Sequence, residues 1–220
     1  MKHIFTLFTA LILLTSCTTQ VAISPDYWNQ KSKVGIIVNV DAPEKYKAGS
    51  QGLLDMAVTS GGKYDEALKL VAEKIQPKEQ LIQNYKQILE NKGKETVVID
   101  YNVDEKTEKK FEGEKQKDKK YAKYDFRSLK SKYNVDEILF VDFKYGFMIS
   151  YYGMIETGKA GFATAYQQII NLNDNSIIHA DNTTSQTIIK KWKDDNYAES
   201  LLRIEEAAKD VSVKGPAAIN

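Results

Sequence analysis

Residues 137–152 read EILFVDFKYGFMISYY, and the order of apolar and polar residues in this stretch decides the fold. After Glu137 every odd position is apolar: Leu139, Val141, Phe143, Tyr145, Phe147, Ile149 and Tyr151. The even positions begin apolar at Ile138 and Phe140 and become mixed from Asp142 onward. A period of two sustained over such a length predicts a long β-strand with one face on the core and the other becoming exposed.

The residues that follow predict two further strands. After an expected loop at 153–158, the alternation returns over 159–172 and again over 177–189. Between these two runs lie Asn173, Asp174, Asn175 and Ser176, which are turn-forming residues. The three strands therefore form an antiparallel meander at the carboxyl end of the fold.

The residues before position 137 alternate between strand and helix patterns. Short β-branched runs at 33–40 and 96–101 predict strands, and the first run is apolar enough to be covered on both faces. Apolar residues at helical spacing predict helices from Tyr64 to Ile75 and from Pro77 to Gly93.

The remaining segments are expected to be loops and two further helices. Residues 41–62 contain proline and four glycines and predict a long loop with a helical turn at 53–58. Helices are expected at 121–133 and at 197–211, the latter with Asn196 as its N-cap. The fold class is α/β, with α+β left open: a mixed sheet, flanked by helices, with an antiparallel meander of long strands.

The amino terminus resembles a bacterial lipoprotein signal. A cationic start at Met1–His3 precedes an apolar run that is too short to span a bilayer, and then Leu14-Thr15-Ser16-Cys17. This last stretch resembles the lipobox, in which the cysteine sulfur is acylated and the cysteine becomes the first mature residue. Cys17 is the only cysteine of the chain, so lipidation at Cys17 is the expectation; an ordinary secretory signal is the alternative.

This interpretation divides the chain into a signal peptide (1–16), a lipidated tether (17–32), a single domain (33–211) and a tail (212–220). Within the domain, residues 104–120 are almost wholly charged and are expected to form a mobile insertion; a docking segment for a partner is the alternative. Thr18 follows the cysteine where an aspartate would resemble an inner-membrane retention signal. We therefore expect attachment to the outer membrane, facing the periplasm.

The charge balance limits the classes of partner. The chain has 31 basic and 30 acidic side chains, and removal of residues 1–16 takes away Lys2, which leaves a formally neutral protein. A neutral protein does not have the basic footprint of a nucleic-acid binder. The expected partners are the membrane, through the lipid, and an envelope protein; a homo-oligomer stays open.

Candidate catalytic groups are few, and neither a metal nor a cofactor is expected. His179 is the only histidine after residue 16, and on a predicted strand it is more typical of a surface residue. Ser60-Gly61-Gly62-Lys63 matches the Ser-x-x-Lys nucleophile motif, but the motif's usual partners are absent from the chain. A serine hydrolase at Ser60 and Lys63 is thus a remote alternative, and the chain is expected not to be an enzyme.

The candidate interaction residues fall into two groups. Gly49, Gly52 and Asp55 lie in a loop whose glycines let backbone amides approach a ligand or another chain, although turn geometry also explains them. Tyr145, Tyr151 and Tyr152 are amphipathic residues of the kind enriched at interfaces, with core packing as the alternative account.

Several stretches together resemble a known group of small periplasmic lipoproteins. They are Tyr133–Phe140, the Tyr-Gly pair at 145–146 and Asn171–Ser176, with Asn175-Ser176 where a glycine is usual. The group includes the curli-secretion lipoprotein and the penicillin-binding-protein activator lipoprotein, and the resemblance covers roughly residues 33–211. It implies a non-enzymatic adaptor or assembly subunit; the curli member's membrane-spanning hairpins have no counterpart here, so no pore is implied.

The leading hypothesis is therefore a lipid-anchored periplasmic protein that acts by protein–protein contact in secretion, envelope assembly or cell-wall synthesis. The alternative is a lipoprotein that binds a small ligand or glycan through the loop from Gly49 to Asp55.

Overall fold

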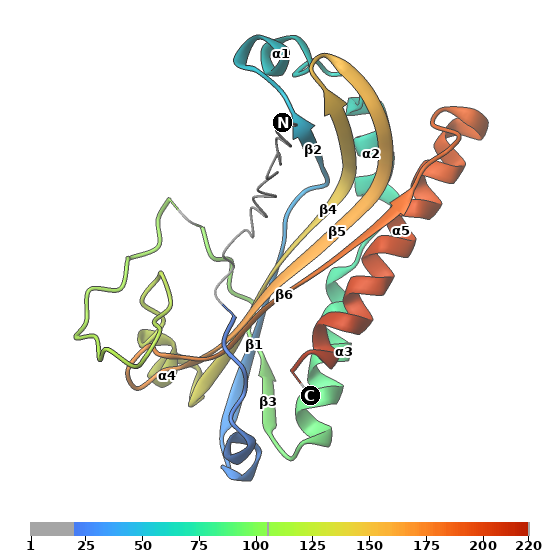
Figure 1. The fold of residues 1–220 in the computed structure, drawn as a ribbon. Helices are drawn as coiled ribbons and strands as arrows, with labels where there is room; N and C mark the ends of the chain where they lie inside the picture. Colours follow the sequence, from blue (N-terminus) through green and yellow to red (C-terminus); the bar gives the residue numbers. More distant parts are fainter. Residues whose placement is uncertain (1–19, 105, 220) are drawn as a thin grey trace, which may run out of the picture.

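The computed structural model describes residues 20–104 and 106–219. The expected signal peptide and the lipidation site at Cys17 lie outside the described residues. The chain folds as an α/β protein around one mixed sheet, as the sequence predicts (Figure 1). The strands are β1 (Lys33–Val40), β2 (Glu44–Ser50), β3 (Glu95–Val98), β4 (Glu137–Tyr152), β5 (Ile155–Asn171) and β6 (Ile177–Ile188).

The sheet has the order β3-β1-β4-β5-β6, and β2 pairs with the same edge of β4 as β1. The strands β1 and β2 both run parallel to β4, and β3 runs parallel to β1. β4, β5 and β6 form the predicted antiparallel meander, in which Glu137 pairs with Asn171 at one end and Tyr152 with Ile155 at the other. β4 is thus the central strand on which the fold is built.

Helices cover one face of the sheet. They are α2 (Asp65–Lys74), α3 (Lys78–Asn91) and α5 (Asp194–Ala217) (Figure 1). The alternating residues of β4 from Leu139 to Tyr151 pack in the main core, together with Val71, Leu81 and Ile204 from the three helices. The odd residues of β4 are therefore apolar because they face the core, as the period of two in the sequence indicates.

The other face of the sheet is covered only around the start of β4. The chain between β3 and β4, which includes the short helix α4 (Ser128–Tyr133), packs there in a second cluster. Ile37, Ile138 and Ile170 supply the sheet side of this cluster. Further along β4 the same face carries the polar residues Asp142 and Lys144.

The expected loop at 41–62 is wrong in its first half. It contains β2, which takes up the pairing with β4 three residues after β1 ends. The sequence of β2, EKYKAGS, is polar because it is a half-exposed edge strand, and lysines are typical of such edges. The second half is confirmed: α1 spans Leu53–Val58.

The expected helix at 121–133 forms only in its last six residues. The part before α4 is extended because the buried Asn175 side chain binds its backbone. Its Oδ1 accepts the amide proton of Phe126 (3.0 Å), and its Nδ2 donates to the carbonyl of Tyr124 (2.9 Å). These are contacts from a distant turn, so the local pattern cannot show them.

Three boundaries at the ends of elements also differ from the expectation. The turn between β4 and β5 contains only Gly153 and Met154, because Ile155–Gly158 pair with β4. The strand expected at 96–101 is β3, which ends at Val98. Asn196 has φ 53° and is not an N-cap; the carboxylate of Glu199 instead accepts the backbone amide protons of Lys190 and Lys191.

Both expected appendages pack on the domain. Val21 forms a bridge with Ala180, and Tyr27 of the 3-10 helix η1 (Pro25–Asn29) is buried, so the tether expected at 17–32 is docked from Val21 onward. α5 continues past the expected end at Val211 to Ala217, with Gly215 and Pro216 buried. His179 is also buried rather than on the surface (4% exposed), facing the core that the docked segment helps to close.

Candidate functional site

One end of the molecule brings together most of the predicted interaction residues. The tip, as we call it, consists of α1 and the β4–β5 turn from Tyr152 to Ile155 (Figure 1). Gly49 pairs with Tyr151 and Ser50 with Tyr152 in the parallel register of β2 and β4. The amide of Gly153 donates to the carbonyl of Ser50 (3.0 Å), so the loop into α1 is tied to the hairpin turn.

Gly49, Gly52 and Asp55 have structural roles within the tip. Gly49 has φ +96°, and a Cβ there would collide with the carbonyl of Tyr151, so only glycine permits this strand pairing. The Asp55 carboxylate accepts the amide proton of Gly52 (2.9 Å) and caps the first turn of α1. The alternative of turn geometry therefore explains these three residues, and they hold α1 in place.

The three predicted tyrosines differ in their exposure to solvent. The hydroxyl of Tyr145 donates to the carbonyl of Ile75 (3.1 Å) within the core, so Tyr145 packs there, as the alternative account expects. Tyr151 is also buried. Tyr152, in contrast, is 75% exposed at the tip.

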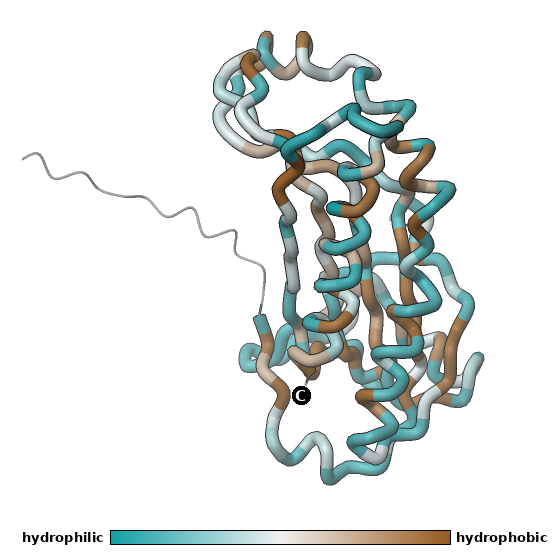
Figure 2. Tube along the Cα trace, turned by 90° about the vertical axis from the view of Figure 1, so that its right-hand side faces the viewer, coloured by the Kyte–Doolittle hydropathy of each residue, from teal (hydrophilic) through white to brown (hydrophobic). Residues whose placement is uncertain are grey.

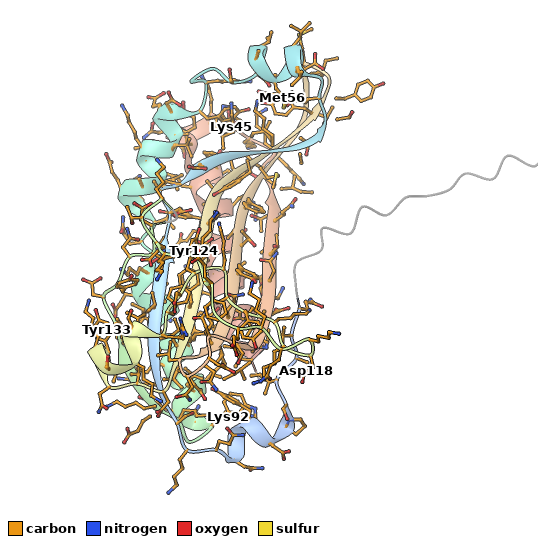
Figure 3. All side chains as sticks on the ribbon, turned by 90° about the vertical axis from the view of Figure 1, so that its left-hand side faces the viewer. Lys45, Met56, Lys92, Asp118, Tyr124 and Tyr133 are labelled. Atoms are coloured by element: carbon orange, nitrogen blue, oxygen red, sulfur yellow. The ribbon has the colours of Figure 1, made fainter. Side chains whose placement is uncertain are left out.

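The sequence reasoning missed the apolar side chains that surround Tyr152. Leu53 is 83% and Leu54 84% exposed, the largest values among the exposed apolar side chains of the described residues. The other large apolar side chains exposed at the tip are Met56, Val58, Met154 and Ile155. Figure 2 shows hydrophobic segments at this end, and Figure 3 labels Met56 there. Exposed apolar side chains gathered at one end of a protein make that end a candidate interaction surface.

Two lysines of β2 hold α1 from below. The Nζ of Lys45 donates to the carbonyl of Thr59 (2.8 Å), and the Nζ of Lys47 donates to the carbonyl of Met56 (3.3 Å) and to the Thr59 hydroxyl (3.0 Å). These carbonyls lie at the C-terminal end of α1, where a cation is favourable. α1 is thus fixed at both ends although none of its residues is buried.

A polar cluster around Glu156 supports the hairpin side of the tip. Its carboxylate accepts hydrogen bonds from Lys63 (2.6 Å) and Tyr64 (2.8 Å), and Lys159 lies 3.1 Å away. Burial alone would raise the pKa of Glu156, but the bonds from these three side chains outweigh it and lower the pKa to about 2. The cluster connects Lys63 and Tyr64, which precede α2, to the start of β5.

The candidate nucleophile pair is engaged in other contacts. The Ser60 hydroxyl donates to the carbonyl of Ala57 (2.6 Å), whereas Lys63 is paired with Glu156. His179 lies far from both, beside the docked segment at Val21, and burial lowers its pKa. The residues proposed for hydrolysis are thus not assembled into one site.

Two further kinds of feature, a metal site and a membrane-spanning helix, concern the described part of the chain. Residues 20–104 and 106–219 contain no group of three or more His, Cys, Asp or Glu side chains that could hold a metal ion. Within the same residues, no helix combines the length and the apolar character that crossing a membrane requires.

Comparisons with known proteins find only distant structural likenesses. No family model and no curated protein sequence matches the chain. A neuraminyllactose-binding hemagglutinin homolog from Helicobacter pylori has a TM-score of 0.39 and 9% identity, covering 86% of this chain and 83% of that one. Protein XCC0632 from Xanthomonas campestris has a TM-score of 0.39 and 10% sequence identity, and the match covers 89% of this chain and 87% of that one. A minor lipoprotein from Acinetobacter baumannii has a TM-score of 0.33 and 12% sequence identity, and the match covers 84% of this chain and 92% of that one. Bacterial lipoproteins are thus among the similar solved structures, but at these scores the likeness carries no argument about function.

Proposed function

We propose that this chain is a lipid-anchored, non-catalytic protein of the bacterial envelope that binds a partner protein through its tip. The observation that carries the proposal is the exposed apolar surface of α1 and the β4–β5 turn, with α1 held in place by hydrogen bonds at both of its ends. A rigid apolar surface needs no ordering when it binds, so little of the binding free energy is spent on conformational entropy.

Burial of the exposed apolar side chains of the tip would contribute a large favourable free energy to binding. Burial of a fully exposed leucine, isoleucine or methionine side chain contributes about 1.5–3 kcal/mol. Leu53, Leu54, Val58, Met154 and Ile155 are each more than half exposed. A partner that covers even three of them gains enough to offset a substantial part of the association cost of about 4–15 kcal/mol.

The position of the tip relative to the amino terminus favours a protein over the anchoring bilayer as the occupant. Val21 forms a bridge with Ala180, and Cys17 is four residues earlier in the sequence. Ala180 pairs with Gln168, and from there to Ile155 β5 runs roughly 43 Å at about 3.3 Å per residue. A lipid at Cys17 therefore leaves the tip free to reach a partner well away from the anchor.

The test is site-specific photocrosslinking in cells with the full chain. A photoreactive residue at Met154 is expected to crosslink to one defined envelope protein, and Leu54→Asp is expected to abolish that crosslink. The matched control is Val213 on α5, which is 63% exposed but lies outside the tip: a crosslinker there, and Val213→Asp, should have no such effect. Crosslinks only to lipid, or only to a second copy of the chain, would contradict the proposal.

The anchor needs its own test, because Cys17 lies outside the described residues. Cys17→Ser is expected to move the protein from the membrane fraction to the soluble periplasmic fraction, while the isolated variant keeps its thermal stability. An unchanged distribution between the two fractions would refute lipid anchoring without touching the proposed role of the tip.

A further inference from the structure

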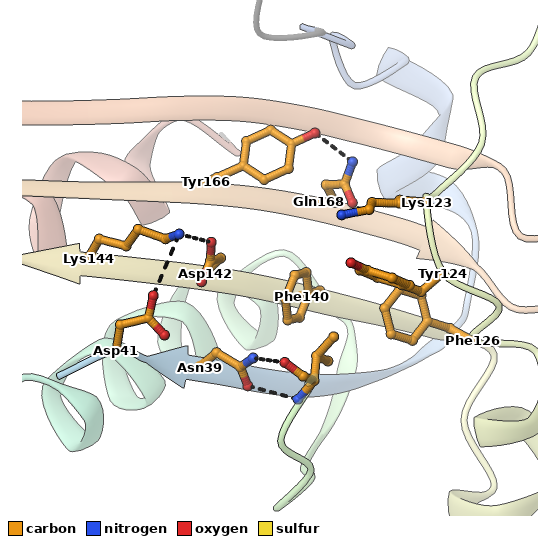
Figure 4. A pocket seen from close by; sticks show the side chains of 11 residues that line it. Asn39, Asp41, Lys123, Tyr124, Phe126, Phe140, Asp142, Lys144, Tyr166 and Gln168 are labelled. Atoms are coloured by element: carbon orange, nitrogen blue, oxygen red, sulfur yellow. Dashed lines mark hydrogen bonds and ion pairs between the residues drawn. The ribbon is translucent and has the colours of Figure 1, made fainter. Parts of the chain in front are cut away.

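A cavity of about 410 Å³ lies on the face of the sheet opposite to the helices (Figure 4). It forms where the chain that covers this face ends and the polar residues of β4 and β5 begin. Its floor is Phe140, Asp142 and Lys144 of β4 with Tyr166 and Gln168 of β5, and its wall includes Tyr124. The volume falls within the range of about 300–1,000 Å³ that is usual for small-molecule sites.

Tyr124 contributes its ring to the wall of the cavity. The residue is 6% exposed, and its hydroxyl is covered by protein atoms. Figure 4 shows Tyr124 beside Phe140 in the lining. A ligand in the cavity therefore meets the ring of Tyr124 rather than its hydroxyl.

The wall that carries Tyr124 is already in place without a ligand. The Asn175 side chain binds the backbone of Tyr124 and Phe126 on one side. On the other side, the Asn39 side chain exchanges hydrogen bonds with the amide and carbonyl of Val103 (3.4 and 3.1 Å). The cavity is therefore preformed, as ligand sites usually are.

The cavity is aromatic but carries no net charge. Phe126 packs against Phe140 with ring centroids 5.8 Å apart, beside Tyr124 and Tyr166. The Nζ of Lys144 lies 3.5 Å from the carboxylates of both Asp41 and Asp142. Burial alone would lower the pKa of Lys144, but the two carboxylates outweigh it and raise the pKa, so the group stays charged. With Lys123, the lining has two acidic and two basic side chains.

We propose that this cavity binds a neutral sugar of one or two rings. Aromatic rings pack against the C–H faces of a sugar, and hydroxyl groups both donate and accept hydrogen bonds, so they match a lining that contains carboxylates, amides and lysines. The Tyr166 hydroxyl accepts the amide proton of Gln168 (2.7 Å), which leaves its own proton for a ligand oxygen. A charged ligand gains little, because the lysine that faces it is already neutralised by two carboxylates. This site does not depend on the tip or on the lipid anchor.

The experiment is isothermal titration calorimetry on the full chain in detergent. The neutral probes are glucose, N-acetylglucosamine, lactose and N,N′-diacetylchitobiose, and the charged comparators are glucosamine and glucose 6-phosphate. At least one neutral probe is expected to bind with a Kd of about 1 mM or tighter. Titration with lactosylceramide in the same detergent separates a lipid headgroup from a free sugar as the source: binding of either form supports the proposal.

The variants locate the site. Tyr166→Phe removes the hydroxyl whose proton is free for a ligand and is expected to weaken binding by roughly 2- to 10-fold. The matched control is Tyr124→Phe, because the Tyr124 hydroxyl is covered by protein atoms although its ring lines the cavity; this variant should bind as the wild type does. Phe140→Leu, which removes an aromatic ring from the floor, serves as a second test if Tyr166→Phe does not fold.

Three outcomes would overturn the proposal. They are the absence of any response to the neutral probes, binding of a charged comparator more than about tenfold tighter than its neutral counterpart, and an unchanged Kd in both Tyr166→Phe and Phe140→Leu. The last outcome would place sugar binding elsewhere on the chain.

Discussion

Gly161→Ala tests how closely α5 packs on the sheet. An added Cβ at Gly161 would lie 2.5 Å from the backbone nitrogen of Ile204, whereas ordinary contact begins near 3.4 Å, so the helix has to move by about 1 Å. Overpacking of this kind costs about 1–3 kcal/mol. The same Cβ would collide with the carbonyl of Arg203, which accepts a hydrogen bond from Thr187, and loss of that bond adds about 1 kcal/mol. We expect the free energy of unfolding to fall by about 2–4 kcal/mol.

Gly158→Ala on the same strand is the matched control. Its added Cβ would meet only the side chain of Ser150, at 3.7 Å, which is an ordinary contact. Because alanine restricts the unfolded chain, this variant should unfold within about 0.5 kcal/mol of the wild type or be slightly more stable. Urea denaturation of the full chain, followed by far-ultraviolet circular dichroism, compares the two. Equal midpoints for Gly161→Ala and Gly158→Ala would refute the close packing of α5.

Three further predictions concern titratable side chains. Burial lowers the pKa of His179, so below pH 6.5 the unfolded chain binds the proton more readily than the folded one. The free energy of unfolding should therefore fall from pH 7 to pH 5 by up to about 1.4 kcal/mol per pH unit. Thermal melts of His179→Phe should show a weaker dependence of the melting temperature on pH. Glu156→Gln should cost about 1–2 kcal/mol at pH 7, after allowance for solvent screening. Since the pKa of Glu156 is lowered to about 2, this difference is present above pH 4.5 and should disappear as the pH of urea titrations falls toward 2. Lys94 donates to the carbonyl of Tyr27 (3.0 Å), so Lys94→Met should raise amide hydrogen exchange in residues 24–32 while exchange in β4 stays unchanged.

The sequence predicts correctly those elements whose structure depends on the residues of the segment itself. β1, α1 and β4 have the expected bounds, because β-branched runs, flanking glycines and a sustained period of two depend on the segment itself. β2 was missed because its pairing depends on β4, nearly a hundred residues later, while its own residues are those of a polar loop. The first half of 121–133 was misassigned for the same reason: the partner that extends it, Asn175, comes from a distant turn.

The candidate site was predicted in part for a related reason. Glycine spacing and Asp55 pointed to the tip, and Tyr152 is exposed there, but alternation in β4 cannot distinguish the face of Tyr145, which helices cover, from an open one. The exposure of Leu53 and Leu54 cannot be predicted from the length of α1, because α4 has the same length and buries Leu129. The cavity at Tyr124 has no local signal in the sequence, because its residues come from five separate segments.

The backbone of the tip restricts how a partner can dock. Pairing with a sheet edge requires free amides and carbonyls, yet the turn amide of Gly153 is bound by Ser50, and the Gly153 carbonyl accepts from the Gln51 side chain (3.0 Å). α1 satisfies its first turn through Asp55 and its last through Lys45 and Lys47. What the tip offers is therefore side-chain surface, so a partner must present an apolar groove rather than a strand. Polar substitution of Leu54 should then abolish binding, whereas a change confined to the lysine-lined edge of β2 should leave binding intact as long as α1 stays folded.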